Sequence, residues 1–458
     1  MQTTQETKRL ILAGLIGLIF FVVTNWYPVL TGEAFEEPDA LKAPIAKEEA
    51  ADAAAAHLQA MGIAGPFETF VMFQSNTDLG GYLQKSGLAK EYDRKYDRDY
   101  PIDYYQVELT DGDRIWLVDV DMMEARVVGW RETTADPDAA PDRATGERLA
   151  LDYAAARGFD PEALALVSAD AGKFVYEAAE QAIGEAPLRL EISVGPQAVA
   201  GFIADFDVPE TYLEWYRDQQ QWMDLVGAIS LLLYIALAFA AVIFAVVYRR
   251  TATFGRGVIL TVLFIVLSTI NYINTYPVVR LMTAGEPGGE LIAWIASFFN
   301  HLFTFVLAAA MYFGLVSGDA AFRARGVNLW PRWREHNYGR YILGAMGRGY
   351  PLAFVLLGVQ GILYWIGERL LGVWSVNDPS FSTFNTLVPA LFPLTAWVAA
   401  ISEEAIYRVF GIAFFRKLFR NTAVAAALSS VLWAVAHIGY PIFPAYTRLV
   451  EVTILGFL

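Results

Sequence analysis

The chain has 458 residues, of which 55% are hydrophobic and 18% are charged, and its formal net charge is -15. This composition is typical of apolar membrane spans that alternate with a soluble region, and the acidic balance argues against nucleic acid as a partner. Cysteine is absent, which excludes disulfides, thiol nucleophiles and cysteine-ligated metals.

Apolar runs of the length needed to cross a bilayer, about 20 residues each, recur along the chain. The first is Leu10–Leu30, which no clear cleavage site follows, and it predicts an uncleaved membrane anchor over residues 1–30. Six further runs follow, at Leu225–Tyr248, Val258–Tyr276, Leu291–Val316, Pro351–Val373, Leu387–Phe415 and Thr422–Tyr440. An eighth run begins near Val450. The sequence therefore predicts a polytopic α-helical membrane protein of about eight spans.

Basic residues follow every second predicted span, in the loops after Tyr248, Val316 and Phe415. Cytoplasmic loops retain Lys and Arg, so this pattern predicts a cytoplasmic N-terminus and an extracytoplasmic region over residues 31–222. Residues 225–348 then hold three spans and a basic cytoplasmic loop. The large outer region indicates the inner membrane of a bacterial cell.

The outer region reads as two tandem α+β units, residues 31–134 and 145–222, separated by the Pro/Asp/Ala-rich linker Thr134–Arg143. Each unit opens with an alanine-rich helix, and strands with hairpin turns follow it. The predicted helices are Lys47–Gly62 and Thr145–Gly158, and the predicted strands are Tyr104–Thr110, Arg114–Val120, Arg126–Trp130, Leu188–Val194 and Ala198–Asp207. This layout resembles the PepSY-like helix-on-sheet modules found outside bacterial membranes, and His57 is expected at the surface of the first helix.

Three charged residues, Glu403, Glu404 and Arg408, lie within the predicted span Leu387–Phe415. Charged groups at this depth cost several kcal/mol and usually perform chemistry or conduct an ion. Glu404 and Arg408 are four residues apart, so they share one helix face and can neutralise each other. Glu403 points about 100° away and is left for another partner.

His437 is the expected partner of Glu403. Glu403 lies about sixteen positions before the midpoint of the basic stretch Phe415–Asn421, and His437 lies about sixteen positions after its end. Both are then roughly 24 Å along adjacent antiparallel helices. The carboxylate and the imidazole can then face each other across the hairpin. A carboxylate that activates water beside an imidazole is the minimum equipment for hydrolysing an amide.

These residues resemble the motifs of the CPBP family, also called Abi, which contains type II CAAX prenyl endopeptidases. Glu403-Glu404-x-x-x-Arg408 is similar to its first motif, and Trp433-x-x-x-His437 to its second, Phe-x-x-x-His. The resemblance covers residues 351–458 and implies a glutamate-dependent intramembrane endopeptidase, often described as a metalloprotease. It implies catalytic roles for Glu403 and His437, with Glu404 and Arg408 completing the first motif. The expected partners are a membrane-associated protein or peptide substrate and the lipid bilayer.

The family has a third motif, a further His followed by Asn four residues later, which does not occur before Leu458. We therefore expect a truncated chain, or a silent site if the chain naturally ends there. Zn²⁺ or another divalent metal is the candidate cofactor, with Glu403 and His437 as candidate ligands; zinc usually has three protein ligands, and only Glu404 is nominally left to add.

Two other functions remain open from the sequence. One is a catalytically inactive CPBP-type scaffold or sensor whose outer region binds a ligand. The other is a transporter that uses the buried carboxylates as a proton relay, although no inverted repeat is visible.

Overall fold

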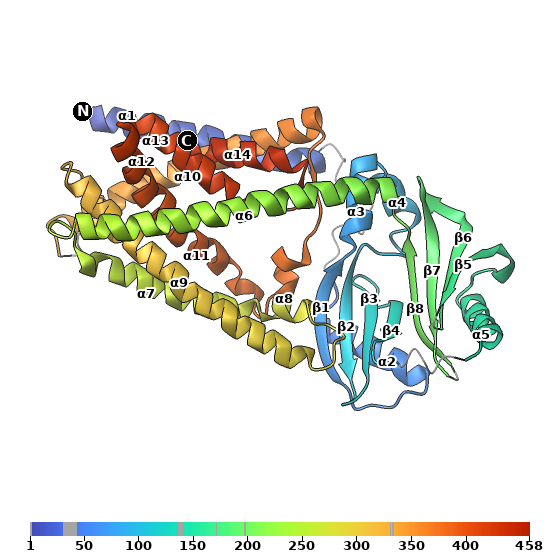
Figure 1. Ribbon diagram of the computed structural model, residues 1–458. Helices are drawn as coiled ribbons and strands as arrows, with labels where there is room; N and C mark the ends of the chain where they lie inside the picture. The colour runs from blue at the N-terminus through green and yellow to red at the C-terminus, as the bar shows by residue number, and fades with distance from the viewer. Residues whose placement is uncertain are drawn as a thin grey trace.

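The computed structural model describes residues 2–30, 44–135, 141–170, 172–196, 198–329, 331 and 334–458. An antiparallel sheet lies at one end of a bundle of long helices, and the N-terminus lies at the other end (Figure 1). The centre of the linker expected at Thr134–Arg143 falls outside the described residues.

Among the described residues, five helices are long and apolar enough to cross a membrane. Their outer faces carry large apolar side chains such as Leu232 and Ile259, which are exposed from the protein and suited to lipid. These helices coincide with the first five predicted spans: α1 (Gln2–Leu30), α6 (Glu210–Val247), α7 (Phe254–Asn274), α9 (Gly289–Arg323) and α10 (Tyr338–Leu371).

The C-terminal helices are shorter. α11 (Pro393–Glu403) continues through a π-helical segment (Glu404–Gly411) into α12 (Ile412–Phe419), and α13 (Thr422–Val435) and α14 (Ala445–Phe457) follow. The sixth span was expected from Leu387, and that boundary is wrong. The chain forms 3₁₀ turns at Pro379–Phe381, Thr383–Asn385 and Pro389–Leu391 before α11 begins.

The sheet has eight strands, and all neighbouring strands pair antiparallel. The two predicted units are not separate sheets, because β4 pairs with β8 through Trp130 with Phe202 and Arg131 with Gly201. In spatial order the strands are β1 (Glu68–Ser75), β2 (Asp103–Thr110), β3 (Ile115–Asp121), β4 (Val127–Glu132), β8 (Val199–Phe206), β7 (Ala186–Val194), β6 (Lys173–Ile183) and β5 (Leu164–Asp170).

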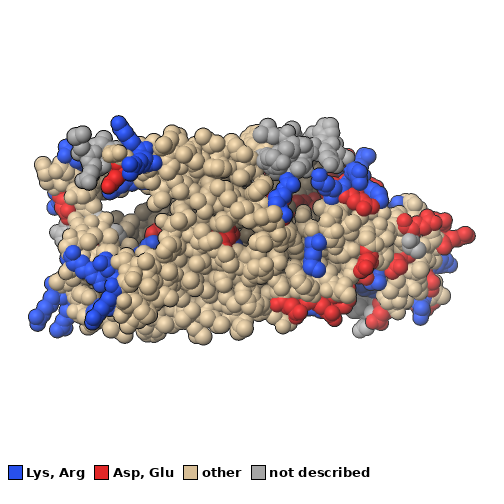
Figure 2. All heavy atoms as spheres, turned by 90° about the horizontal axis from the view of Figure 1, so that it is seen from above, with Lys and Arg blue, Asp and Glu red and all other residues tan. Residues whose placement is uncertain are grey.

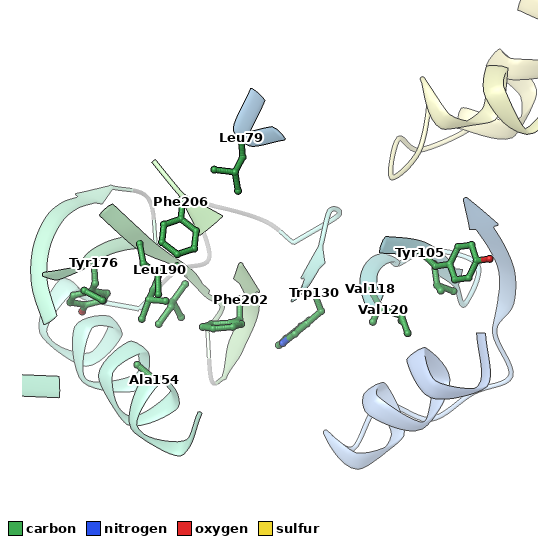
Figure 3. Packing of buried hydrophobic residues seen from close by; sticks show 14 of the residues in the cluster. Leu79, Tyr105, Val118, Val120, Trp130, Ala154, Tyr176, Leu190, Phe202 and Phe206 are labelled. Carbon is green, nitrogen blue, oxygen red and sulfur yellow. The ribbon is translucent and has the colours of Figure 1, made fainter. Parts of the chain in front are cut away.

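Helices α2 (Lys47–Ala60) and α5 (Arg143–Ala156) each cover one half of the sheet and bury alanines against it. Trp130 and Phe202 lie where the two halves of the core meet, with Leu190 on one side and Val118 on the other (Figure 3). The predicted pattern of alanine-rich helices on antiparallel strands is therefore confirmed, within one continuous core.

His57 is not the surface residue expected from the sequence. Its ring packs edge-on against Trp130 with a centroid separation of 6.0 Å, and its Nε2 is buried without a hydrogen-bond partner among the described residues. Burial and the nearby Arg157 guanidinium both lower the pKa of this imidazole.

Two buried polar contacts fix the sheet to the bundle. Arg280 of α8 (Tyr276–Leu281) forms an ion pair with Glu108 of β2, and Glu108 also accepts a hydrogen bond from Gly285 N at 2.9 Å. Asn385 donates to Phe73 O at 2.9 Å and accepts from Phe73 N at 2.8 Å. The segment between α10 and α11 is thereby held against β1.

Candidate active site

Glu403 ends α11, and His437 follows the last turn of α13. The structure brings Glu403 Oε1 to 3.5 Å from His437 Nε2, with 27% of the glutamate side chain and 15% of the histidine side chain exposed. The two antiparallel helices thus carry the carboxylate and the imidazole at the same depth, as their spacing in the sequence predicts. Their catalytic roles remain a prediction.

Trp433 connects the two residues. Its indole Nε1 donates a hydrogen bond to Glu403 Oε2 at 2.6 Å, and its carbonyl oxygen lies 2.8 Å from His437 Nδ1. A carbonyl oxygen only accepts hydrogen bonds, so Nδ1 carries a proton and Nε2 is the nitrogen that faces Glu403. Trp433 therefore orients the carboxylate and fixes the imidazole.

Arg408 lies beside this pair. Its Nε is 3.6 Å from Glu404 Oε1, so the two residues form the ion pair expected from their spacing. The Glu404 side chain is 60% exposed from the protein, whereas the Arg408 guanidinium stacks over the Trp433 ring at 4.1 Å. Arg408 thus also supports Trp433, a contact that the helix spacing alone did not predict.

The first motif lies in the π-helical segment Glu404–Gly411. A wider turn releases backbone groups from the regular ladder, and such turns are frequent at functional sites. Ser429 of α13 donates to Tyr407 O, and Gly318 of α9 lies against the backbone of Val409. Contacts from two neighbouring helices therefore hold the segment.

Asparagines of α7 hold the start of α11. Asn271 Oδ1 accepts a hydrogen bond from the Thr395 hydroxyl at 2.8 Å, and Asn274 Oδ1 accepts from Val388 N at 2.7 Å. These contacts fix where the helix that carries Glu403 begins.

A cavity of about 510 Å³ opens beside His437. Tyr440 borders it, and its ring lies parallel to the His437 ring at a centroid separation of 5.9 Å. The polar groups of its wall are few, and the other lining residues are Ala353, Leu356, Leu357, Gln360, Trp433, Arg448, Val452 and Leu455. The site therefore adjoins a largely apolar space that can take a substrate side chain.

Glu403 and His437 are the metal ligands expected from the sequence. Within the described part of the chain, no group of three or more His, Asp or Glu side chains could hold a metal ion. Glu403 and His437 come together, but Glu404 pairs with Arg408 instead. Two donors do not complete a zinc site, which usually has three protein ligands.

Residues 385–458 match the family model described as type II CAAX prenyl endopeptidase Rce1-like. The matched range contains both motifs, and the CPBP resemblance is therefore confirmed for this part of the chain. None of the curated proteins or solved structures matches, and the PepSY-like resemblance of the outer region is not confirmed. The segment that brings Glu403 and His437 together is therefore similar to the Rce1-like, CAAX-type intramembrane proteases of the CPBP family.

Proposed function

We propose that the protein is a glutamate-dependent intramembrane endopeptidase that hydrolyses peptide bonds of membrane-associated proteins or peptides. The observation that carries the proposal is the 3.5 Å approach of Glu403 Oε1 to His437 Nε2 within the segment that the protease family matches. Charged side chains within membrane-spanning segments are rare and are usually functional.

The Glu403–His437 pair can hold one proton between the carboxylate and Nε2, because Nδ1 already donates to Trp433 O. With the proton on Nε2, the ring is an imidazolium and the glutamate is a carboxylate. Glu403 is then the base, and His437 is a hydrogen-bond donor.

Hydrolysis follows from these roles. Glu403 takes a proton from water while the water oxygen attacks the carbonyl carbon of the peptide bond. The carbonyl electrons move to oxygen, which accepts a hydrogen bond from His437 Nε2–H. When the tetrahedral intermediate collapses, the C–N bond breaks and the proton on Glu403 passes to the leaving amine. The carboxylate is regenerated, and water has been divided between the two products.

The distribution of charge supports an orientation in which the sheet lies outside a bacterial inner membrane. Lys and Arg gather at the end of the bundle away from the sheet, whereas acidic side chains are prominent on the sheet end (Figure 2). The N-terminus lies at the basic end (Figure 1). Basic loops are retained in the cytoplasm, so the substrate's outer segment would meet the sheet.

Sequencing of new protein N-termini in membranes tests the proposal. Cells with the full-length protein are compared with cells that carry Glu403→Gln or His437→Ala, and Glu368→Gln on α10 is the matched control. Glu368 lies exposed on a neighbouring helix. We expect the protein-dependent termini to disappear in both site variants and to persist in the control. Undiminished cleavage by Glu403→Gln would overturn the mechanism, and no protein-dependent terminus in any sample would favour an inactive scaffold.

A further inference from the structure

A cavity of about 1000 Å³ lies between the sheet and the bundle. One wall comes from the end of β1 and from α3 (Thr77–Ser86) and α4 (Ala89–Lys95), and the other from residues 375–384. This volume is at the upper end of the range for ligand sites. It can hold a stretch of extended peptide.

The same cavity adjoins the smaller cavity at the candidate active site. Tyr440 lines it and also lines the smaller cavity that contains His437. The Tyr440 and His437 rings are stacked with an interplanar angle of 7°. The two cavities therefore share one lining side chain, and a chain that occupies the larger one lies next to the cavity lined by His437.

The lining of the larger cavity selects for positive charge. It contains one lysine and one arginine, Lys90 and Arg94, against five aspartates, Asp93, Asp97, Asp103, Asp121 and Asp378. An acidic wall in a partly enclosed cavity raises the local concentration of cations.

Asp103 offers an acceptor within this wall. Its Oδ2 accepts a hydrogen bond from Asn377 at 2.7 Å, whereas its Oδ1 is buried and has no hydrogen-bond partner among the described residues. A buried acceptor without a donor is costly. An ammonium or guanidinium group is the kind of donor that this acceptor lacks.

We propose that this cavity binds the extracytoplasmic segment of the substrate as an extended peptide that carries lysine or arginine. The protein would then choose its substrate by a basic segment outside the membrane, and the smaller cavity would receive the residues next to the bond that is cut. The inference rests on the proposed function, but the binding step does not require catalysis.

Crosslinking to an engineered cysteine tests the site. The chain has no native cysteine, so an introduced thiol is the one that reacts. Ser75→Cys places a thiol in the cavity wall, and Ser168→Cys places one on the exposed strand β5, in the distal half of the sheet. The full-length protein is treated with a bromoacetylated ten-residue peptide that contains two lysines, or with its glutamate counterpart. Each rate of labelling by a peptide is divided by the rate at which the same cysteine reacts with iodoacetamide.

We expect the lysine peptide to label Ser75→Cys about tenfold faster than the glutamate peptide, with a rate that saturates with peptide concentration. Asp97→Asn with Asp103→Asn in the same protein should remove most of this preference. Asp113→Asn, in an exposed turn outside the cavity, should leave it unchanged. Ser168→Cys should show no saturation.

Equal rates for the two peptides, or a rate that does not saturate, would overturn the proposal. Glu403→Gln in the Ser75→Cys protein separates it from the proposed function. Saturable labelling that persists in this variant shows binding whether or not the protein cleaves peptides, and labelling lost in this variant alone would contradict a separate binding cavity.

Discussion

The indole Nε1 of Trp433 donates a 2.6 Å hydrogen bond to Glu403 Oε2, so the second motif directly orients the first. The family residue at this position is phenylalanine, which has the ring but no donor. This chain thus adds a polar contact to an aromatic one. The carboxylate is held by Trp433 on one oxygen and faces His437 with the other.

Trp433→Phe should therefore reduce catalysis without unfolding the protein. The ring remains against Arg408, but one oxygen of Glu403 loses its donor. We expect kcat to fall about tenfold or more, with little change in KM, as is typical when an outer hydrogen bond to a reactive group is removed. Trp397→Phe on exposed α11 surface is the matched control. Equal kcat in the two variants would show that the indole N–H has no positioning role.

Gly318→Ala should destabilise the protein, although alanine is normally the better helix residue. A Cβ at Gly318 would lie 2.5 Å from Val409 O and 2.7 Å from Val409 C, and a backbone cannot move aside cheaply. We expect a loss of about 1–3 kcal/mol, together with reduced activity, because the π-helical segment must shift. Gly344→Ala, whose Cβ would meet nothing within 4 Å, should be neutral or stabilising in the same thermal melts. Similar melting temperatures would contradict close packing of α9 on this segment.

Arg280→Ala should be strongly destabilising. The Arg280 and Glu108 side chains are 8% and 5% exposed, and removal of the arginine leaves a buried carboxylate whose remaining donor among the described residues is Gly285 N–H. Losses of about 3–5 kcal/mol are typical of such changes. Arg217→Ala breaks the exposed ion pair with Glu210 and should cost about 1 kcal/mol or less. Thermal unfolding in detergent measures both, and equal losses would show that the buried pair does not hold the sheet on the bundle.

His57 should make the protein less stable at acidic pH. Its folded pKa is lowered from 6.5, first by burial and then by Arg157, so the unfolded state binds the proton more readily. The associated stability is present above pH 6.5 and is lost as pH falls below it. His57→Gln should reduce the drop in melting temperature between pH 7.5 and pH 5.5, whereas His336→Gln, at an exposed position, should not. An unchanged drop in the His57 variant would mean that its environment does not disfavour the proton.

The proposed orientation predicts which cysteines an impermeant maleimide can reach in spheroplasts. Ser168→Cys on the sheet should react at once, and Asn328→Cys after α9 should react only when detergent is added, because basic loops stay inside. Protease added to spheroplasts should likewise cleave within residues 44–222 and spare residues 323–348. The reverse pattern would invert the molecule and bring different substrates to the site.

The sequence predicts those parts of the fold that depend on short-range pattern. Helix periodicity gives the spans, and similar distances from the basic turn at Phe415–Asn421 bring Glu403 and His437 to one depth. The hydrogen bond between Trp433 and Glu403 is different, because it depends on the rotamer of an indole on another helix. A 3.6-residue pattern of apolar residues also does not predict the π-helical segment.

The strands of the eight-stranded sheet missed by the sequence are β1, β5 and β6, although β5 and β6 form a hairpin. β1, with the sequence Glu-Thr-Phe-Val-Met-Phe-Gln-Ser, lacks a clean alternation because one face packs in the sheet core and the other approaches the bundle. Arg280 and Glu108 are 172 residues apart, so no local sequence pattern predicts their pairing. The start of α11 was placed too early because residues 387–391 are apolar yet lie before the helix, where Leu387 N and Val388 N donate hydrogen bonds to Asn274 of α7.

The amide of Asn385 satisfies both the N–H and the C=O of Phe73, as a neighbouring strand would. β1 is an edge strand, and an uncovered edge is a template for pairing with another chain. A soluble fragment that contained the sheet alone would expose this edge and leave Glu108 without its arginine. Such a fragment should associate edge to edge, so the outer region and the membrane helices must be produced and purified as one molecule.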